Sequence, residues 1–336
     1  MNRGVRGVRG PSAIVAGTMS PRSTTLFLTL CLVSACSSPP PVLRLSGQEF
    51  GVEVRRDIPY VSHDGIDLAL DVWTPDCPGP HPTAIVVHGG GWRVGDRDFA
   101  DARVLAEALA REGIAAVSVS HRRAPRHVHP AQIEDLRRAL QFVRVNGADF
   151  DLEVTRLAAI GTSSGGHLVA LLATQDDRAE PGAAEPLRRA STKPDCVVAL
   201  CAPFDLLPVE GEPATTMQIN LVRAFLGLDA EPGIERKVAL LHERGRDASP
   251  LTWVSPDDPP FLVIHGDADT IVPPSQARRM VAALRAAGVA CRHVEIPRGG
   301  HAEFLFVRNA DWVEAPPPFW RELRSFLATE LLGREP

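Results

Sequence analysis

Residues 157–173 read LAAIGTSSGGHLVALLA: a short apolar run, a glycine-rich turn around Ser163, and a second apolar run of helix-forming residues. This order predicts a strand, a sharp turn and a helix. A serine at the tip of such a turn has a strained backbone, so glycines two residues away on each side are needed where a β-carbon would collide with neighbouring chain. Its hydroxyl also lies near a helix N-terminus, whose partial positive charge favours a developing oxyanion. Ser163 is therefore the candidate nucleophile, although a Gly-x-Ser-x-Gly pattern can also simply join a strand to a helix.

A second glycine-rich stretch, HGGGW at residues 88–92, directly follows an apolar run at residues 84–87. Glycines let backbone N–H groups turn toward a bound carbonyl oxygen, and each such donor is worth about 3 kcal/mol in a transition state. The N–H groups of Gly90 and Gly91, with that of Ser164, are the candidate oxyanion hole. A phosphate-binding loop is the alternative, but no Lys-Ser or Lys-Thr pair follows these glycines.

A candidate acid and a candidate base follow the last apolar runs. Residues 261–269 read FLVIHGDAD, and a carboxylate at such a strand end reaches the rim of the sheet where a histidine from the next loop would arrive. Asp269 is the preferred acid and Asp267 the reserve, although either could be a turn or helix-capping residue. His301 follows two glycines and both acids, which matches the order serine, acid, histidine in which the α/β-hydrolase fold delivers a catalytic triad.

The pattern of apolar runs predicts the whole fold. Residues 53–61 and 66–73 alternate apolar and polar side chains around a turn, as an antiparallel hairpin does. Short apolar runs then recur in the manner of parallel strands covered on both faces, with helical spacing between several of them. The runs are residues 84–87, 114–119, 157–160, 197–200, 261–264 and 293–296, and the helical faces lie within residues 133–143 and 319–327. The prediction is an α/β-hydrolase fold with a mostly parallel, doubly wound sheet of about eight strands.

Residues 206–248 interrupt this alternation with prolines, acidic residues and one amphipathic stretch at residues 219–226. We interpret this segment as a small cap over the site, inserted in a hydrolase domain of residues 51–334. One such domain is more economical for 336 residues than two small ones. The net charge is −5 and the basic residues are dispersed, so nucleic acid is not an expected partner.

The first 36 residues have the build of a secretory signal peptide. Arg22 precedes the apolar run of residues 26–33, which ends in small residues. The run is shorter than the roughly 20 residues of a membrane-spanning helix. Its end, VSAC, resembles the bacterial lipobox, so Cys36 is a candidate lipidation site, unless it is a chance cysteine beside an ordinary cleavage site. Translation could also begin at Met19, which would leave a signal of ordinary length.

Residues 37–50 begin SSPPP and suit a flexible tether, because serine and proline bury little surface and resist helix formation. The expected location is therefore the bacterial cell envelope, reached by export, with membrane contact only through a lipid anchor. Without the anchor, the protein would be periplasmic or secreted.

The remaining cysteines and histidines give weaker signals. Cys77, Cys196, Cys201 and Cys291 could pair in an exported protein, but spacing does not give the pairing, and buried free thiols are equally compatible with the sequence. His121, His127 and His129 cluster in a proline-rich loop without a His-Glu-x-x-His pattern, so neither a metal nor an organic cofactor is expected. His88 and His265 precede turns and are expected to stabilise loops through backbone hydrogen bonds.

Several motifs in order resemble one bacterial esterase branch. They are HGGGW at 88–92, PAQIED at 130–135, GTSSGGHL at 161–168, SPLT at 249–252 and HGDADTIVP at 265–273. The branch includes feruloyl and acetyl-xylan esterase-like proteins and is close to the hormone-sensitive-lipase-like carboxylesterases; the resemblance covers about residues 55–330. It implies that Ser163, Asp269 and His301 hold the triad positions. Thr162, Ser164 and His121 depart from the usual residues, which puts substrate preference in doubt more than catalysis.

The resulting expectation is a serine carboxylic ester hydrolase for a small or short-acyl ester, either a small molecule or linked to a polysaccharide. His301 would take the proton of Ser163, the serine would attack the ester carbonyl, and water would later release the acid. Two alternatives stay open: an amidase or formamidase on the same triad, and an envelope binding protein that kept the fold and lost turnover. The sequence carries no signal of oligomeric state.

Overall fold

The computed structural model describes residues 49–63, 65–305 and 318–333, and within them the chain begins with the expected hairpin. Strand β1 (Val52–His63) pairs antiparallel with β2 (Ile66–Pro75), confirming that prediction. The predicted signal peptide, the candidate lipidation site Cys36 and most of the predicted tether lie outside the described residues. In the described ranges no helix is both long and apolar enough to cross a bilayer.

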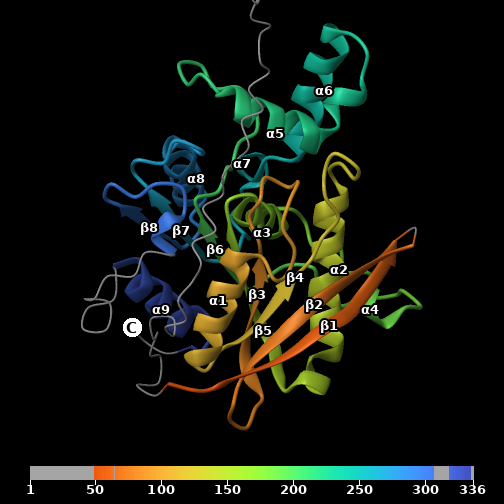
Figure 1. The fold of residues 1–336 in the computed structure, drawn as a ribbon, viewed down its shortest axis with the longest axis vertical. Coiled ribbons are helices and arrows are strands. Elements are labelled where there is room, and N and C mark those ends of the chain that lie inside the picture. The colour runs from red at the N-terminus through yellow and green to blue at the C-terminus, as the bar shows by residue number, and fades with distance from the viewer. Residues whose placement is uncertain (1–48, 64, 306–317, 334–336) are drawn as a thin grey trace, which may run out of the picture. The chain divides into compact units, whose positions relative to one another are not determined.

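The central sheet of the described chain has eight strands in the order β1-β2-β4-β3-β5-β6-β7-β8 (Figure 1). From β4 to β8 in this order, each strand pairs in parallel with the next. Strand β2 pairs antiparallel with β4, as it does with β1. The remaining strands are β3 (His81–Val87), β4 (Ala115–Val119), β5 (Leu152–Thr162), β6 (Cys196–Leu200), β7 (Phe261–Gly266) and β8 (Cys291–Ile296). The sheet therefore confirms the predicted α/β-hydrolase fold, because each apolar run of the sequence lies within a strand to within one residue.

Helices cover both faces of the sheet, which is why the strands read as continuous apolar runs. Side chains alternate in direction along a strand, so Ile85 faces one hydrophobic core and Val86 the other. The core that includes Ile85 is completed by α2 (Ala131–Asn146), α3 (Ser164–Thr174) and α8 (Ser275–Ala286). The core that includes Val86 is completed by α1 (Ala100–Arg111) and α9 (Pro318–Glu330). Both predicted helical faces, on α2 and α9, are buried in these cores.

The segment expected to form a cap contains α5 (Thr216–Leu226) and α6 (Ile234–Asp247), joined by the short 3₁₀ helix η2 (Leu228–Ala230). Helix α5 begins with a capping box in which Thr215 and Gln218 bond to each other's backbone N–H groups. Figure 1 shows both helices at the end of the sheet from which α3 starts. The short elements that complete the chain are η1 (Gly147–Phe150), α4 (Pro186–Arg189), α7 (Pro250–Trp253) and η3 (Glu303–Leu305).

Candidate active site

Ser163 lies between the end of β5 and the start of α3 with φ 53° and ψ −120°, a strained conformation for a residue with a side chain. The glycines around it are required by close backbone contacts. A β-carbon on Gly161 would lie 2.4 Å from the carbonyl of Gly165, and one on Gly165 would lie 2.2 Å from the carbonyl oxygen of Val87. The turn is held by the N–H of Ser163, which donates to the carbonyl of Leu200 at 2.7 Å.

The structure brings the three predicted triad residues together from three loops. The Nε2 atom of His301 lies 2.9 Å from the Ser163 hydroxyl oxygen, and its Nδ1 lies 2.7 Å from Oδ2 of Asp269. The ring can therefore accept the serine proton on one side while it donates to the carboxylate on the other. Asp267, the reserve acid, is exposed and instead accepts a hydrogen bond from the N–H of Arg298.

Asp269 is surrounded by hydrogen-bond donors. Its Oδ1 accepts from the N–H groups of Ile271 at 2.8 Å and Val272 at 2.9 Å, and its Oδ2 faces both His301 and His265. Burial alone would raise the pKa of Asp269, but the hydrogen bonds from the two histidines and from the backbone outweigh burial and hold the pKa well below its ordinary value. The carboxylate is thus kept ionised opposite the imidazole.

The predicted oxyanion glycines lie in the loop after β3. Gly90 has φ 112°, and a β-carbon there would lie 2.2 Å from the carbonyl oxygen of Val94, so only glycine fits. Gly91 and Ser164 line the same pocket as Ser163. The loop is fixed by Asp101, a buried residue of α1 whose Oδ2 accepts the N–H of the neighbouring Gly89 at 2.8 Å.

Sequence reasoning missed Asp101. Burial raises the pKa of this carboxyl, and the N–H groups of Gly89 and Ala102 oppose that rise. The available signal was an aspartate in the first turn of a helix, which is the ordinary place for a carboxylate that interacts with helix N–H groups. Nothing in that pattern indicates that one oxygen reaches back to the glycine loop.

Helix α5 of the segment expected to form a cap packs directly on the loop of the predicted oxyanion glycines. Phe225 of α5 stacks on Trp92 with ring centroids 4.5 Å apart, and His167 of α3 contacts both rings edge-on. Leu221, one turn earlier on α5, lies so close to Gly91 that a β-carbon on this glycine would be 2.8 Å from the leucine side chain. Helix α5 therefore holds the glycine loop in place as well as covering it.

A pocket of about 660 Å³ opens beside Ser163 between the cap and the sheet end. Its walls are mostly aliphatic and come largely from the cap, while Gly91, Ser163 and Ser164 form the part next to the candidate nucleophile. The aliphatic wall residues include Leu206, Leu207, Val209, Ile219, Leu221, Val222 and Leu241. Such a concave apolar space with a few polar groups at one end is typical of a small-molecule site.

Two buried histidines, one directly before the predicted oxyanion glycines, stack on each other. The rings of His88 and His121 lie 4.6 Å apart at an interplanar angle of 8°. Each donates from Nδ1 to a backbone carbonyl, His88 to Gly89 at 2.6 Å and His121 to Arg122 at 2.8 Å. Burial, followed by the proximity of the two rings in the case of His121, lowers the pKa of His88 to about 4 and that of His121 to about 3. Both rings therefore stay neutral in the folded protein near pH 5.

These buried histidines predict a loss of stability in mild acid. His167, whose pKa burial lowers to about 3, adds a third such group. In the unfolded chain each ring binds a proton below about pH 6.5, while the folded chain does not, so the free energy of unfolding falls as pH drops below 6.5. We expect each ring to cost about 2 kcal/mol of stability by pH 5. Urea unfolding of the wild type and of His121→Phe at pH 7.5 and pH 5 measures how much of this acid-dependent loss of stability is due to His121.

The variant should lose about 2 kcal/mol less than the wild type between the two pH values. If the free energies of unfolding of the two proteins differed by the same amount at pH 7.5 and at pH 5, this account would be contradicted, because His121 would then contribute only packing.

The other histidines and the cysteines singled out in the sequence have separate environments in the structure. His129 pairs with Asp247 at 2.7 Å and His121 stacks on His88, so the loose histidine cluster is divided between separate partners. In the described part of the chain, Cys77, Cys196, Cys201 and Cys291 are all free.

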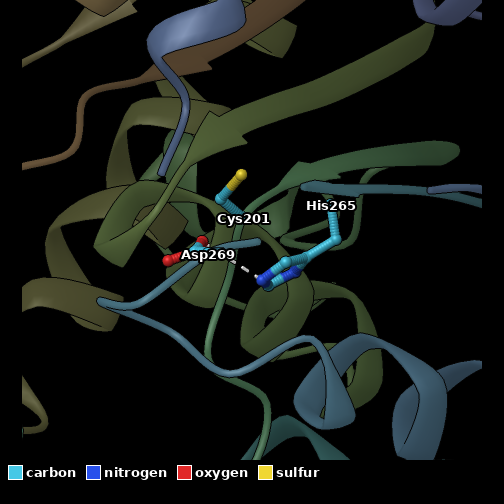
Figure 2. Close-up of side chains that lie close together, drawn as sticks. All are labelled: Cys201, His265 and Asp269. Carbon is cyan, nitrogen blue, oxygen red and sulfur yellow. Dashed lines mark ion pairs between the residues drawn. The ribbon is translucent and has the colours of Figure 1, made fainter. Parts of the chain in front are cut away.

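Cys201, His265 and Asp269 form the one group of described residues whose ligand atoms lie within 4.8 Å of one another (Figure 2). Burial raises the pKa of the Cys201 thiol to about 12, so it keeps its proton, and Asp269 is already saturated with hydrogen-bond donors. These three side chains fit a hydrogen-bonded environment for the acid better than they fit a metal ion.

The fold and the serine, histidine and aspartate at the ends of its strands define this chain as an α/β-hydrolase-fold protein. The model of the BD-FAE family matches residues 70–284, and the chain belongs to that family. It is similar to the Mycobacterium tuberculosis proteins Esterase LipC, 35% identical over 69% of this chain and 56% of the relative, and Probable carboxylic ester hydrolase LipM, 31% identical over 80% and 60%. The chain thus spans only a little over half the length of these curated relatives.

Solved structures with the same fold include two bacterial enzymes. One is the acetyl ester-xyloside bifunctional hydrolase from Caldicellulosiruptor lactoaceticus, with a TM-score of 0.67, 23% identity, and coverage of 86% of this chain and 98% of that one. The other is the esterase Est2 from Thermogutta terrifontis in its propionate-bound form, with a TM-score of 0.64, 24% identity, and coverage of 83% and 94%. At these identities the likeness concerns the fold alone.

Proposed function

We propose that this protein is a serine carboxylic ester hydrolase that acts through an acyl-enzyme. The observation that carries the proposal is the continuous hydrogen-bonded chain from the Ser163 hydroxyl through His301 to Asp269, with distances of 2.9 and 2.7 Å. The names of the relatives, which are esterases and carboxylic ester hydrolases, support the same reaction class.

The mechanism follows from this geometry. As Ser163 attacks the ester carbonyl, His301 Nε2 accepts the hydroxyl proton, and Asp269 stabilises the imidazolium that forms. The carbonyl oxygen becomes negative and is bound by the N–H groups of Gly90, Gly91 and Ser164. His301 then gives its proton to the leaving alcohol. Water, activated by the same histidine, hydrolyses the acyl-enzyme and regenerates the serine.

The charges in the pocket indicate which acyl groups are accepted. Each charged side chain in the described pocket wall has a partner: Asp205 pairs with Arg279, Glu212 accepts from the Ser275 hydroxyl, and Arg223 pairs with Asp229. No cation is left over within this wall to pair with a substrate carboxylate, and burying an unpaired charge is costly. We therefore propose an ester with an uncharged acyl group.

The proposal predicts that a fluorophosphonate probe labels the purified protein at Ser163, as identified by peptide mass spectrometry. The phosphonyl group mimics an ester at its carbonyl and reacts only with an activated serine. Labelling should disappear in His301→Ala, because the serine then lacks its base. A folded wild-type protein that stays unlabelled would refute the proposal and favour the binding-protein alternative.

The uncharged-acyl proposal predicts the outcome of a substrate series. Among aryl esters that share one leaving group, the butyryl ester should be hydrolysed at least about 100-fold faster, in kcat/KM, than the succinyl ester, whose free carboxylate would lie in the apolar pocket. Equal rates on the two esters would contradict the proposed acyl preference. An aryl formamide compared with the aryl formate ester separates an esterase from an amidase, because only the leaving group differs between these two substrates.

A further inference from the structure

His265 lies at the end of β7 and is fully buried next to the acid of the triad. Its Nε2 is 2.9 Å from the carbonyl oxygen of Val272 and 3.2 Å from Oδ2 of Asp269. The backbone hydrogen bond agrees with the loop-stabilising role expected from the sequence. The contact with Asp269 was not foreseen, and in Figure 2 the imidazole points toward this carboxylate.

The two contacts fix where the proton of His265 is. A carbonyl oxygen can only accept a hydrogen bond, so Nε2 must carry the hydrogen that it donates to Val272. The same N–H also faces Asp269, which makes the bond shared between two acceptors. Nδ1 is buried and has no hydrogen-bond partner among the described residues, so a second proton there would have nothing to donate to.

The N–H of His265 acts on Oδ2 of Asp269, which is the same oxygen that contacts His301. This oxygen receives N–H groups from both histidines, while Oδ1 is already fixed by the backbone of residues 271 and 272. The donor from His265 therefore sets how much negative charge on Oδ2 is left to stabilise a protonated His301.

We propose that His265 is a positioning residue for the catalytic triad: its Nε2–H holds Oδ2 of Asp269 against His301 and withdraws part of its charge. This inference rests on the proposed function of Ser163 and extends it to a residue outside the triad. Other titratable groups around this pair are few. His293 and Glu295 of β8 interact electrostatically with His265, Cys201 and Glu303 lie in the same region as Asp269, and Asp101 of α1 interacts with His301.

The test is the rate of Ser163 labelling by the fluorophosphonate probe between pH 5 and pH 9 in the full-length protein. His265→Leu removes the donor and keeps an apolar side chain. We expect its labelling rate constant to fall about 10- to 100-fold, because the carboxylate that orients the His301 ring loses one of the donors that hold it in place. We also expect the acid limb of its pH profile to move to higher pH, since Asp269 now stabilises protonated His301 more strongly.

Two further variants separate a positioning role from a merely structural one. His265→Gln keeps an N–H₂ group that can reach both Val272 and Asp269. It should restore most of the labelling rate and return the acid limb of the pH profile to the wild-type pH. His81→Gln changes a buried histidine at the start of β3, at the far end of that strand from the oxyanion loop, and should leave the profile unchanged.

Two results would overturn the inference: an acid limb at the wild-type pH in His265→Leu, or a glutamine variant as slow as the leucine variant although both are folded by circular dichroism. Either would leave the proposed function intact as long as the wild type is labelled at Ser163. An unlabelled wild type would instead remove the proposed function itself.

Discussion

Asp269→Asn is expected to lower kcat/KM for an aryl ester about 10⁴-fold while the protein stays folded. The amide oxygen of asparagine can still accept the N–H groups of Ile271 and Val272, so the turn keeps its shape. Its NH₂ group then takes the place of Oδ2 and faces the Nδ1 of His301 as a donor. The histidine must place its proton on Nε2 instead, where it can no longer accept the proton of Ser163.

Asp267→Asn is the matched control, because it makes the same chemical change two residues away. Asp267 is exposed and bonds the backbone of Arg298, so its replacement should leave kcat/KM within about threefold of the wild type. Steady-state kinetics of the two variants on the same ester provide the comparison. Equal losses in both would show that the acid of the triad is not Asp269 alone.

Gly165→Ala is expected to destabilise the protein by about 3 kcal/mol or more, or to prevent folding. The added β-carbon would lie 2.2 Å from the carbonyl oxygen of Val87 and 2.5 Å from that of His88. Both atoms belong to the backbone at the end of β3, which is paired on both sides within the sheet and cannot easily move. Urea unfolding measures the loss.

Gly182→Ala serves as the control for this substitution. A β-carbon on Gly182 meets nothing within 4 Å, so the free energy of unfolding should change by no more than about 0.5 kcal/mol. If Gly165→Ala were as stable as Gly182→Ala, the close approach of α3 to β3 would not be the reason for this glycine.

The sequence alone predicted the order and type of the main elements. A strand buried on both faces is a run of apolar residues, and a covering helix repeats apolar residues on one face, so both periodicities are visible before the chain is folded. Strand ends were less visible: β5 begins at Leu152, five residues before the apolar run that predicted it. Helices α1 and α8 were not predicted, because the helical faces named from the sequence lay only in α2 and α9 and in the helix after Ser163.

Within the candidate site, local patterns identified the residues that sit on special backbone. Ser163 and Gly90 could be named because a strained turn demands glycine or small residues at fixed spacing. Asp269 was the preferred acid and Asp267 the reserve, and the family resemblance implied the same choice, but no local pattern separates two aspartates that follow the same strand. The structure distinguishes them because one points into the sheet rim and the other into solvent.

The sequence by itself determined the apolar runs of the α/β-hydrolase fold and the turn that exposes Ser163, because each of these depends on neighbours within a few residues, and the order of serine, acid and histidine follows directly from their positions in the chain. Only the tertiary structure decided that His265 and Asp101 support the site and that Leu221 and Phe225 of the cap pack on the oxyanion loop. Those contacts join segments far apart in the chain or depend on side-chain direction. A sequence pattern shows neither the contacts between distant segments nor the side-chain directions, because both arise only when the sheet brings the loops to one edge.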